Sequence, residues 1–399
     1  AIDEITRILA SDGRDKAREQ ALRILQFWPD VVTRTGWGAE ADAETDTEAD
    51  TETSVITGEG ANDHPEQRER SALLTATLPL VTRLDEAALS DIGNALLAPF
   101  RLVDLSRDAV PHFVELLDTH GLISVRAVLD AWQAKPRHHE PGESIHAWLS
   151  TTLSTLIRAL CARTNGDLPA AGRVLAAEIL ANRWACLRQR IETVDRFDNA
   201  DLTAQQLSRY GEPLLALIES AVIADQPALR DTILGFVDKN LDADLADAVP
   251  LQLPLAVLRA ADRNHTADPT SRDTWRDLGL EPLRQRLTQA LSARLARPAR
   301  DDDDWSIHTP IRCTCELCKT LTDFLRSPRN KRLDWPLAEQ RRAHVHGAID
   351  AHGLPVRHVT RRQGRPFTLV LEKTRALFDQ DAAARRSWAH DLAWIEALQ

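Results

Sequence analysis

Cysteine is scarce in this sequence, since 399 residues contain only five. Three of the five stand together in "CTCELC", and Cys161 and Cys186 stand alone in segments with a helical pattern. An odd number of cysteines with this spacing does not fit the disulfide framework of a small secreted protein. The sequence therefore predicts a protein of a reducing compartment, which we expect to be the cytoplasm.

Long apolar runs are also missing. No run reaches the roughly 18 residues that a membrane-spanning helix needs. The first residues, "AIDEITRILA", have neither the basic n-region nor the apolar h-region of a secretory signal. We therefore expect a soluble chain with no membrane partner.

Familiar catalytic motifs are absent. The sequence contains no P-loop, no GxSxG elbow, no SxxK, no dinucleotide-binding GxGxxG and no HExxH. Its motifs do not indicate an enzyme, and we favour a non-catalytic protein.

Acidic residues are concentrated near the beginning. Residues 39 to 66 carry ten carboxylates and neither Lys nor Arg. The alternation of acid with Ala and Thr leaves little to bury, which predicts a disordered acidic linker over residues 37–68. An acidic tail that mimics nucleic acid is the alternative. Residues 1–36 before the linker have the pattern of an amphipathic helical arm.

From residue 69 to residue 298 the pattern is helical almost throughout. Apolar residues recur at three- and four-residue spacing over 69–98, 109–120, 123–135, 143–164, 168–194, 203–224, 226–244, 249–262 and 272–296. Gly121 is placed to end a helix, and Asp225 to cap the start of the one that follows. Because no fixed repeat period is present, we predict a mainly α fold, either a multi-helix bundle or an irregular α-solenoid.

The character of the chain changes at a second acidic linker, residues 299–304, which contains Asp301 to Asp304. Residues 305–399 hold the three clustered cysteines and the clearest β-hairpin pattern. They are also basic, because residues 305–380 have 14 Lys and Arg against 7 Asp and Glu. We predict a small C-terminal α+β module, a zinc knuckle with a hairpin, ending in a helix.

Cys315 and Cys318 form a CxxC pair, the spacing at which two thiolates of one tight turn reach the same tetrahedral ion. Cys313, His344 and His358 compete for the two remaining places. Structural zinc is the favoured interpretation because metal binding contributes directly to the folding of a small module. The alternatives are a redox pair and plain packing of small apolar side chains. A redox CxxC is expected within a βαβ unit, and the sequence shows no such unit.

The histidines are assigned from helical periodicity. Residues 336–352 are expected to form a helix with Val345 and Ile349 on its apolar face. His344 lies at the edge of that face and His346 points away from it. The edge position makes His344 a candidate ligand.

His358 is assigned from the hairpin pattern. Gln363 and Gly364 are predicted to form a two-residue turn, in which Gly364 takes the positive φ. This register places His358 opposite Leu369 on the inward face, and so His358 is the other candidate ligand.

Three stretches of this module, "CTCELCKTLTDFLRSP", "WPLAEQRRAHVH" and "HVTRRQGRPFTLVLEKT", carry a resemblance. Over about residues 312 to 375 the chain resembles the cysteine-containing C-terminal region of long bacterial and fungal 2-oxoglutarate- and Fe(II)-dependent oxygenases of the prolyl 4-hydroxylase type. In such proteins a separate upstream β-barrel holds iron through a His-x-Asp or His-x-Glu pair and a distal His. The resemblance therefore implies a non-catalytic part.

The chain departs from the oxygenase pattern at the iron ligands. His-x-Asp does not occur, and the His-x-Glu matches start at His64, in the acidic linker, and at His138, between prolines. Neither lies in a strand pattern, so the oxygenase activity is not transferred to this chain.

Three functions follow as expectations. The favoured one is a non-catalytic scaffold whose helical platform binds a protein or peptide partner and whose module holds structural zinc. The second is nucleic-acid binding by the basic module, with the expected contacts from Arg357, Arg361, Arg362 and Arg365. The third is an accessory C-terminal part of a 2-oxoglutarate/Fe(II) oxygenase.

Overall fold

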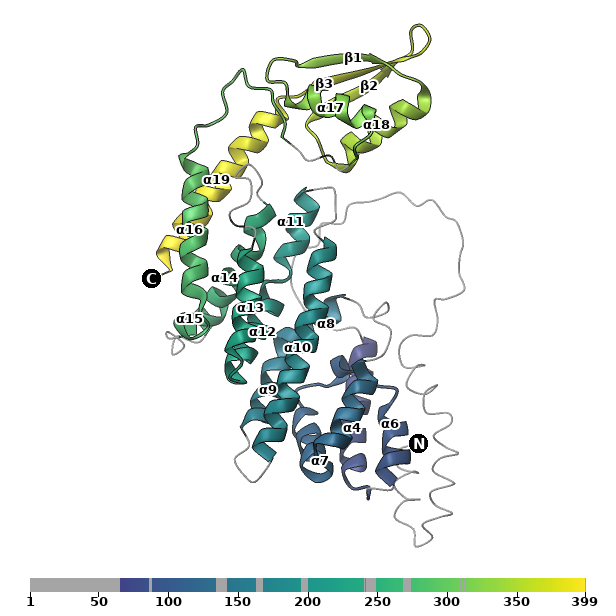
Figure 1. Ribbon diagram of the computed structural model, residues 1–399, viewed down its shortest axis with the longest axis vertical. Helices are drawn as coiled ribbons and strands as arrows, with labels where there is room; N and C mark the ends of the chain where they lie inside the picture. The colour runs from purple at the N-terminus through teal and green to yellow at the C-terminus, as the bar shows by residue number, and fades with distance from the viewer. Residues whose placement is uncertain are drawn as a thin grey trace. The chain divides into compact units, whose positions relative to one another are not determined.

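A computed structural model describes residues 65–85, 88–133, 142–162, 168–194, 200–239, 241, 249–267, 274–308, 311 and 313–398. These residues are mostly helical, with one small antiparallel sheet near the C-terminus (Figure 1). The predicted mainly α fold with a small C-terminal α+β module is confirmed. The predicted arm over 1–36, and the predicted acidic linker up to residue 64, lie outside the described residues.

The chain separates into two compact units, Ala1–Arg183 with Ala216–Leu229 and Trp184–Leu215 with Arg230–Gln399. Helices α10 (Leu168–Val194), α12 (Gly211–Ile223) and α13 (Pro227–Asp238) each contribute residues to both units. Within the part of the chain that the structure describes, no helix combines the length and the apolar character needed to cross a membrane.

The first unit contains the described α-helices that precede α10. They are α4 (Pro65–Thr82), α6 (Asn94–Leu97), α7 (Val110–Gln133), α8 (Gly142–Trp148) and α9 (Ser154–Cys161). Gly121 interrupts α7 with a φ of 76°, as expected for a glycine that ends a helical segment. The helix predicted over 69–98 is wrong as one element, because α4 ends at Thr82 and a π-helical turn at Leu89–Gly93 precedes α6.

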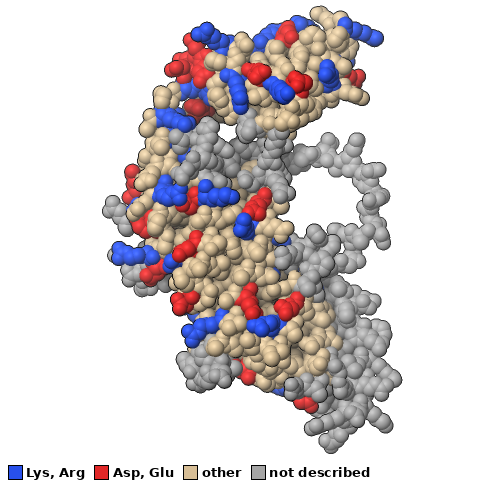
Figure 2. Space-filling model, in the orientation of Figure 1, with Lys and Arg blue, Asp and Glu red and all other residues tan. Residues whose placement is uncertain are grey.

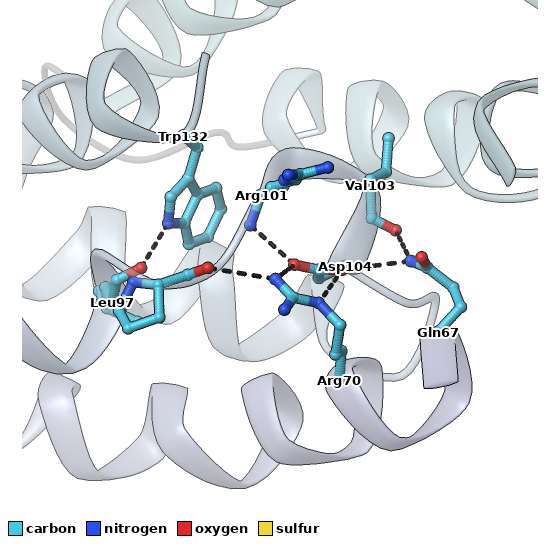
Figure 3. A network of polar contacts seen from close by, with 8 residues as sticks. Gln67, Arg70, Leu97, Arg101, Val103, Asp104 and Trp132 are labelled. Atoms are coloured by element: carbon cyan, nitrogen blue, oxygen red, sulfur yellow. Dashed lines mark hydrogen bonds and ion pairs between the residues drawn. The ribbon is translucent and has the colours of Figure 1, made fainter. Parts of the chain in front are cut away.

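A buried ion pair fixes the turn between α6 and α7 (Figure 3). The Arg70 guanidinium of α4 donates to both carboxylate oxygens of Asp104, at 3.1 and 2.8 Å. The same carboxylate accepts the backbone N–H of Arg101 at 2.8 Å. The Trp132 indole donates to the Leu97 carbonyl at 2.8 Å. Buried polar groups require such partners, and these hold the connecting segment against two helices.

The second unit contains the remaining helices before the module. They are α11 (Ala200–Ser208), most of α13, α14 (Val249–Ala267), α15 (Thr274–Asp277) and α16 (Leu280–Ala296). The helix predicted over 203–224 is divided at Gly211, because that residue lies against α14. A Cβ at Gly211 would meet the Ala256 carbonyl oxygen at 2.3 Å.

Asp225 differs from its predicted role. It has a φ of 54°, and the next residue, Gln226, donates its backbone N–H to the Ala221 carbonyl at 2.8 Å. This is the left-handed ending of α12, so Asp225 ends one helix instead of capping the next. The following helix, α13, begins at Pro227, where a proline was expected.

Helix α19 (Ala376–Ala397) packs beside α16. The Arg385 guanidinium donates to the Leu295 and Arg297 carbonyls, both at 3.0 Å, and so satisfies acceptors at the end of α16. Ile395 is fully buried and Leu377 is buried in the core of the C-terminal module. The same helix thus joins the module to α16.

The module places two helices on one face of its sheet (Figure 1). Strands β1 (Arg332–Pro336), β2 (Val356–Arg361) and β3 (Thr368–Lys373) are antiparallel, with β3 in the centre. Helices α17 (Glu316–Arg326) and α18 (Glu339–Ala351) cover the inward face. The core comprises Ile307, Leu321, Phe324, Leu325, Leu337, Val345, Ile349, Leu354, Val356, Leu369, Leu371 and Leu377.

The hairpin register differs from the predicted one. His358 lies opposite Leu371 instead of Leu369, a slip of two residues. The ladder stops at Arg361 and Thr368, so the connection is longer than Gln363 and Gly364, and Pro366 within it has no N–H for a ladder hydrogen bond. Because side chains alternate with a period of two, the slip leaves His358 on the inward face. Strand β1 was not predicted.

Candidate metal centre

The N-terminus of α17 presents the CxxC pair. Cys315 is the residue before the first turn, with an extended backbone, and its sulfur lies 3.5 Å from the backbone N–H of Cys318. A side chain in this position caps a helix by accepting a free N–H. Cys318 is buried in the first turn of the helix, whereas Cys313 and Cys315 are exposed.

His344 comes from α18. The buried side of α18 is centred on Val345 and Ile349. At 3.6 residues per turn, His344 and His346 lie about 100° to either side of Val345. They therefore occupy opposite flanks of the buried stripe. His344 lies on the flank that meets the start of α17.

Four ligand atoms converge at this point. The Nε2 atom of His344 lies 3.7 Å from Cys313 Sγ, 3.3 Å from Cys315 Sγ and 3.2 Å from Cys318 Sγ. All four atoms lie within 4.8 Å of one another. Zn–S bonds of about 2.3 Å and a Zn–N bond of about 2.0 Å would set each sulfur about 3.5 Å from the nitrogen of a tetrahedral site. The group can therefore hold a metal ion.

The thiols differ in acidity. The pKa of Cys315 is lowered to about 6, chiefly because the backbone N–H of Cys318 stabilises the thiolate. The pKa of Cys318 is raised to about 12, first because the thiol is buried and then because the other two cysteines stand beside it. A thiolate at Cys315 next to the buried thiol of Cys318 is the arrangement that a dication would stabilise, because a bound metal replaces the proton.

His358 does not belong to the cysteine group. Its Nε2 lies 3.0 Å from Asp350 Oδ1, and its Nδ1 lies 2.5 Å from the Nδ1 of His346. The sheet face was predicted correctly, but His358 lies over the other flank of α18. The structure thus brings together four of the five candidate ligands and leaves His358 elsewhere.

His346 was expected to point away from the buried face, and this prediction is wrong. The ring is half-buried between α18 and β2, where it contacts His358. Burial is the first cause of a lowered His346 pKa, followed by repulsion from His358. Asp350, which bonds His358, was not singled out from the sequence. Its i, i+4 spacing from His346 on one helix face is the signal that would have found it.

The predicted nucleic-acid contacts lie on β2 and in the turn after it, and all four arginines are exposed. Arg361 pairs with Asp334 on β1 at 2.8 Å, and Arg357 lies opposite Glu372 on β3. Figure 2 shows both acidic and basic side chains on the C-terminal module. The basic charge of the sheet is therefore partly neutralised, whereas Arg362 and Arg365 project from the turn.

The CxxC lies at a helix N-terminus, a feature that it shares with redox CxxC pairs. It does not lie in a βαβ unit, because the described strands form one antiparallel sheet. His64 and the whole His-x-Glu sequence at His138 lie outside the described residues, whereas Glu66 belongs to α4. Searches for a matching protein family, for similar curated proteins and for similar solved structures gave no match.

Proposed function

We propose that Cys313, Cys315, Cys318 and His344 bind one zinc ion whose role is structural, in a non-catalytic binding protein. The observation that carries the proposal is the convergence of four protein donors at the spacing of a tetrahedral site. A catalytic zinc keeps one position for water or substrate, whereas four protein ligands close the coordination sphere.

The donor set favours zinc. Three thiolates and one imidazole form a common structural zinc set, and soft thiolate ligands disfavour magnesium, calcium and manganese. The reducing compartment predicted from cysteine usage keeps thiols available as ligands.

The ion would connect elements that share a small core. Cys313 and Cys315 precede α17, Cys318 belongs to its first turn, and His344 belongs to α18. A module of this size supplies limited core stability, and a metal adds to it directly. The resemblance to oxygenase C-terminal regions supports the same proposal, because those regions lie outside the catalytic barrel.

Metal content tests the zinc proposal. The full chain, purified without chelators, should carry about one tightly bound zinc. Cys318→Ser should lose it, while Cys161→Ser, a matched change at a cysteine in α9, should keep it. A wild-type chain that carries far less than one zinc, or a Cys318→Ser variant that retains it, would contradict the proposal. A disulfide between Cys315 and Cys318 in place of metal would support the redox alternative.

We further propose that the helical region binds a protein or peptide partner. Its support is Ile123 of α7, which is 84% exposed and so the most exposed large apolar residue of the described part of the chain. Ile123→Asp should abolish recovery of a specific partner in affinity purification, whereas Arg188→Asp on α10, at an exposed charged position, should not. Equal recovery by the wild type and both variants would refute this role for Ile123.

A second candidate function is nucleic-acid binding by the turn after β2. The observation in its favour is the exposure of Arg362 and Arg365 in that turn. Phosphate contacts weaken steeply with salt. Binding of a short duplex or single strand that is detectable at low salt and lost in Arg362→Ala/Arg365→Ala would support this function. Absence of binding even at low salt would dispose of it.

A further inference from the structure

On the flank of α18 that faces away from the cysteines, two histidines face each other, each with its Nδ1 atom. His346 is on α18 and His358 is on β2, and their Nδ1 atoms are 2.5 Å apart. The ring centroids are 4.8 Å apart and the ring planes are inclined by 54°. The two rings are thus turned so that both Nδ1 atoms point at one location.

The far nitrogen of each ring has its own partner. His358 Nε2 lies 3.0 Å from Asp350 Oδ1, and His346 Nε2 lies 3.4 Å from the Thr360 hydroxyl. An ionised carboxylate only accepts hydrogen bonds, so Asp350 holds the proton of neutral His358 on Nε2. The lone pair of His358 is then on Nδ1 and directed at His346. Metal-bound histidines typically show this carboxylate–imidazole arrangement.

We propose that His346 and His358 form a second metal site, which takes a divalent transition-metal ion of the zinc, cobalt, nickel or copper class through the two Nδ1 atoms. Asp350 is a positioning residue that orients His358. Imidazole is a preferred ligand of this class of ion, whereas magnesium and calcium prefer oxygen ligands. Two protein ligands leave the other coordination positions to water, so the ion is exchangeable.

The geometry requires a small adjustment. Two Zn–N bonds of about 2.0 Å at a tetrahedral angle separate the nitrogens by about 3.3 Å. The rings therefore have to move apart by somewhat under 1 Å, which side-chain rotation can provide because they belong to different elements. The nearby Arg342 guanidinium donates to the Leu337 carbonyl and lies over the Phe367 ring, 5.3 Å from its centroid. These contacts hold the Arg342 guanidinium against Leu337 and Phe367.

The second site shares no ligand with the cysteine site. His344 faces the cysteines with Nε2, whereas His346 and His358 face each other with Nδ1. Loss of one site therefore leaves the ligands of the other in place. A chain that fails to bind zinc at the cysteines can still bind it here, so the two proposals fail separately.

The test uses the full chain dialysed against increasing zinc chloride, with bound zinc measured by elemental analysis. The wild type should bind a tight equivalent and then a weaker second one. His346→Ala and His358→Ala should each lose the second equivalent and keep the first, and Asp350→Asn should weaken the second by about 10- to 100-fold. His390→Ala, at an exposed histidine on α19, should bind as the wild type does. Far-UV circular dichroism checks that each variant is folded.

Ring-nitrogen NMR identifies the donor atoms. The second equivalent should shift the Nδ1 resonances of His346 and His358 and leave the His344 resonances unchanged. A wild type without a second equivalent would overturn the proposal. Unchanged second-site affinity in both His346→Ala and His358→Ala would overturn it as well.

Discussion

The buried Arg70–Asp104 pair allows a quantitative prediction. The exposed fraction is 5% for Arg70 and 1% for Asp104, and the pair has two hydrogen bonds of 3.1 and 2.8 Å. Arg70 also donates to the Pro99 carbonyl at 3.1 Å, and Asp104 accepts from Gln67 at 3.3 Å. Asp104→Ala removes the charge partner of a buried guanidinium and the acceptor at the end of the turn.

The expected cost of Asp104→Ala is about 3–5 kcal/mol in the free energy of unfolding, the usual cost of breaking a buried ion pair on one side. Arg70→Met/Asp104→Ala removes both charges. It should cost less than the sum of the two single changes, with a coupling of about 2–3 kcal/mol. The exposed Arg126–Glu178 pair of the same unit is the matched control, and Glu178→Ala should cost under about 1 kcal/mol.

Urea unfolding followed by circular dichroism gives the stabilities, and hydrogen exchange of the peptide around residues 97–104 locates the effect. Additive single changes, or an Asp104→Ala cost no greater than that of Glu178→Ala, would refute the argument that the pair is coupled and buried.

Three further predictions concern the second unit. Gly211→Ala should destabilise it by about 1–3 kcal/mol because the new Cβ meets the Ala256 carbonyl oxygen at 2.3 Å; Gly235→Ala, where nothing lies within 4 Å, should be neutral or stabilising in the same thermal melt. Burial lowers the pKa of Lys373 to about 8, so from about pH 8 to pH 10.4 the unfolded state binds more protons and this residue makes stability rise with pH. Lys373→Met should remove that rise in pH-dependent urea titrations of zinc-loaded protein, and an unchanged slope would show that Lys373 is not its source. His344→Ala should weaken zinc binding and lower the melting temperature, and His352→Ala is the control. Competition with a chelator measures the zinc affinity of each variant. Equal affinities for both variants would exclude His344 as a ligand.

Much of the fold follows from local pattern. Helical periodicity predicted most helices, and Gly121 was correctly placed at an interruption. The breaks that were missed depend on tertiary contacts. Gly211 divides a predicted helix because it lies against Ala256, which sequence spacing does not reveal. Aspartate is a suitable residue both for a helix N-cap and for a left-handed helix end. The sequence alone does not distinguish the two roles, and the φ of 54° at Asp225 shows the second.

For the candidate site, the sequence predicted the helix flank of His344 and the sheet face of His358. The CxxC spacing and the flank position of His344 gave three of the four donors that converge, but Cys313, His344 and His358 were left to compete for two places. The period-two pattern placed His358 on the inward face, but it carries no information about which flank of α18 lies above it. The packing of α18 across β2 decides that, and it brings His346 and Asp350 to His358 instead of the cysteines.

The central claim is a zinc ion held by three sulfurs and one imidazole, and X-ray absorption at the zinc edge tests it most directly. On the full chain loaded with one equivalent of zinc, the spectrum should fit three sulfurs at about 2.3 Å and one nitrogen at about 2.0 Å. A first shell of nitrogen and oxygen alone, or the failure of the chain to retain one zinc, would contradict the account.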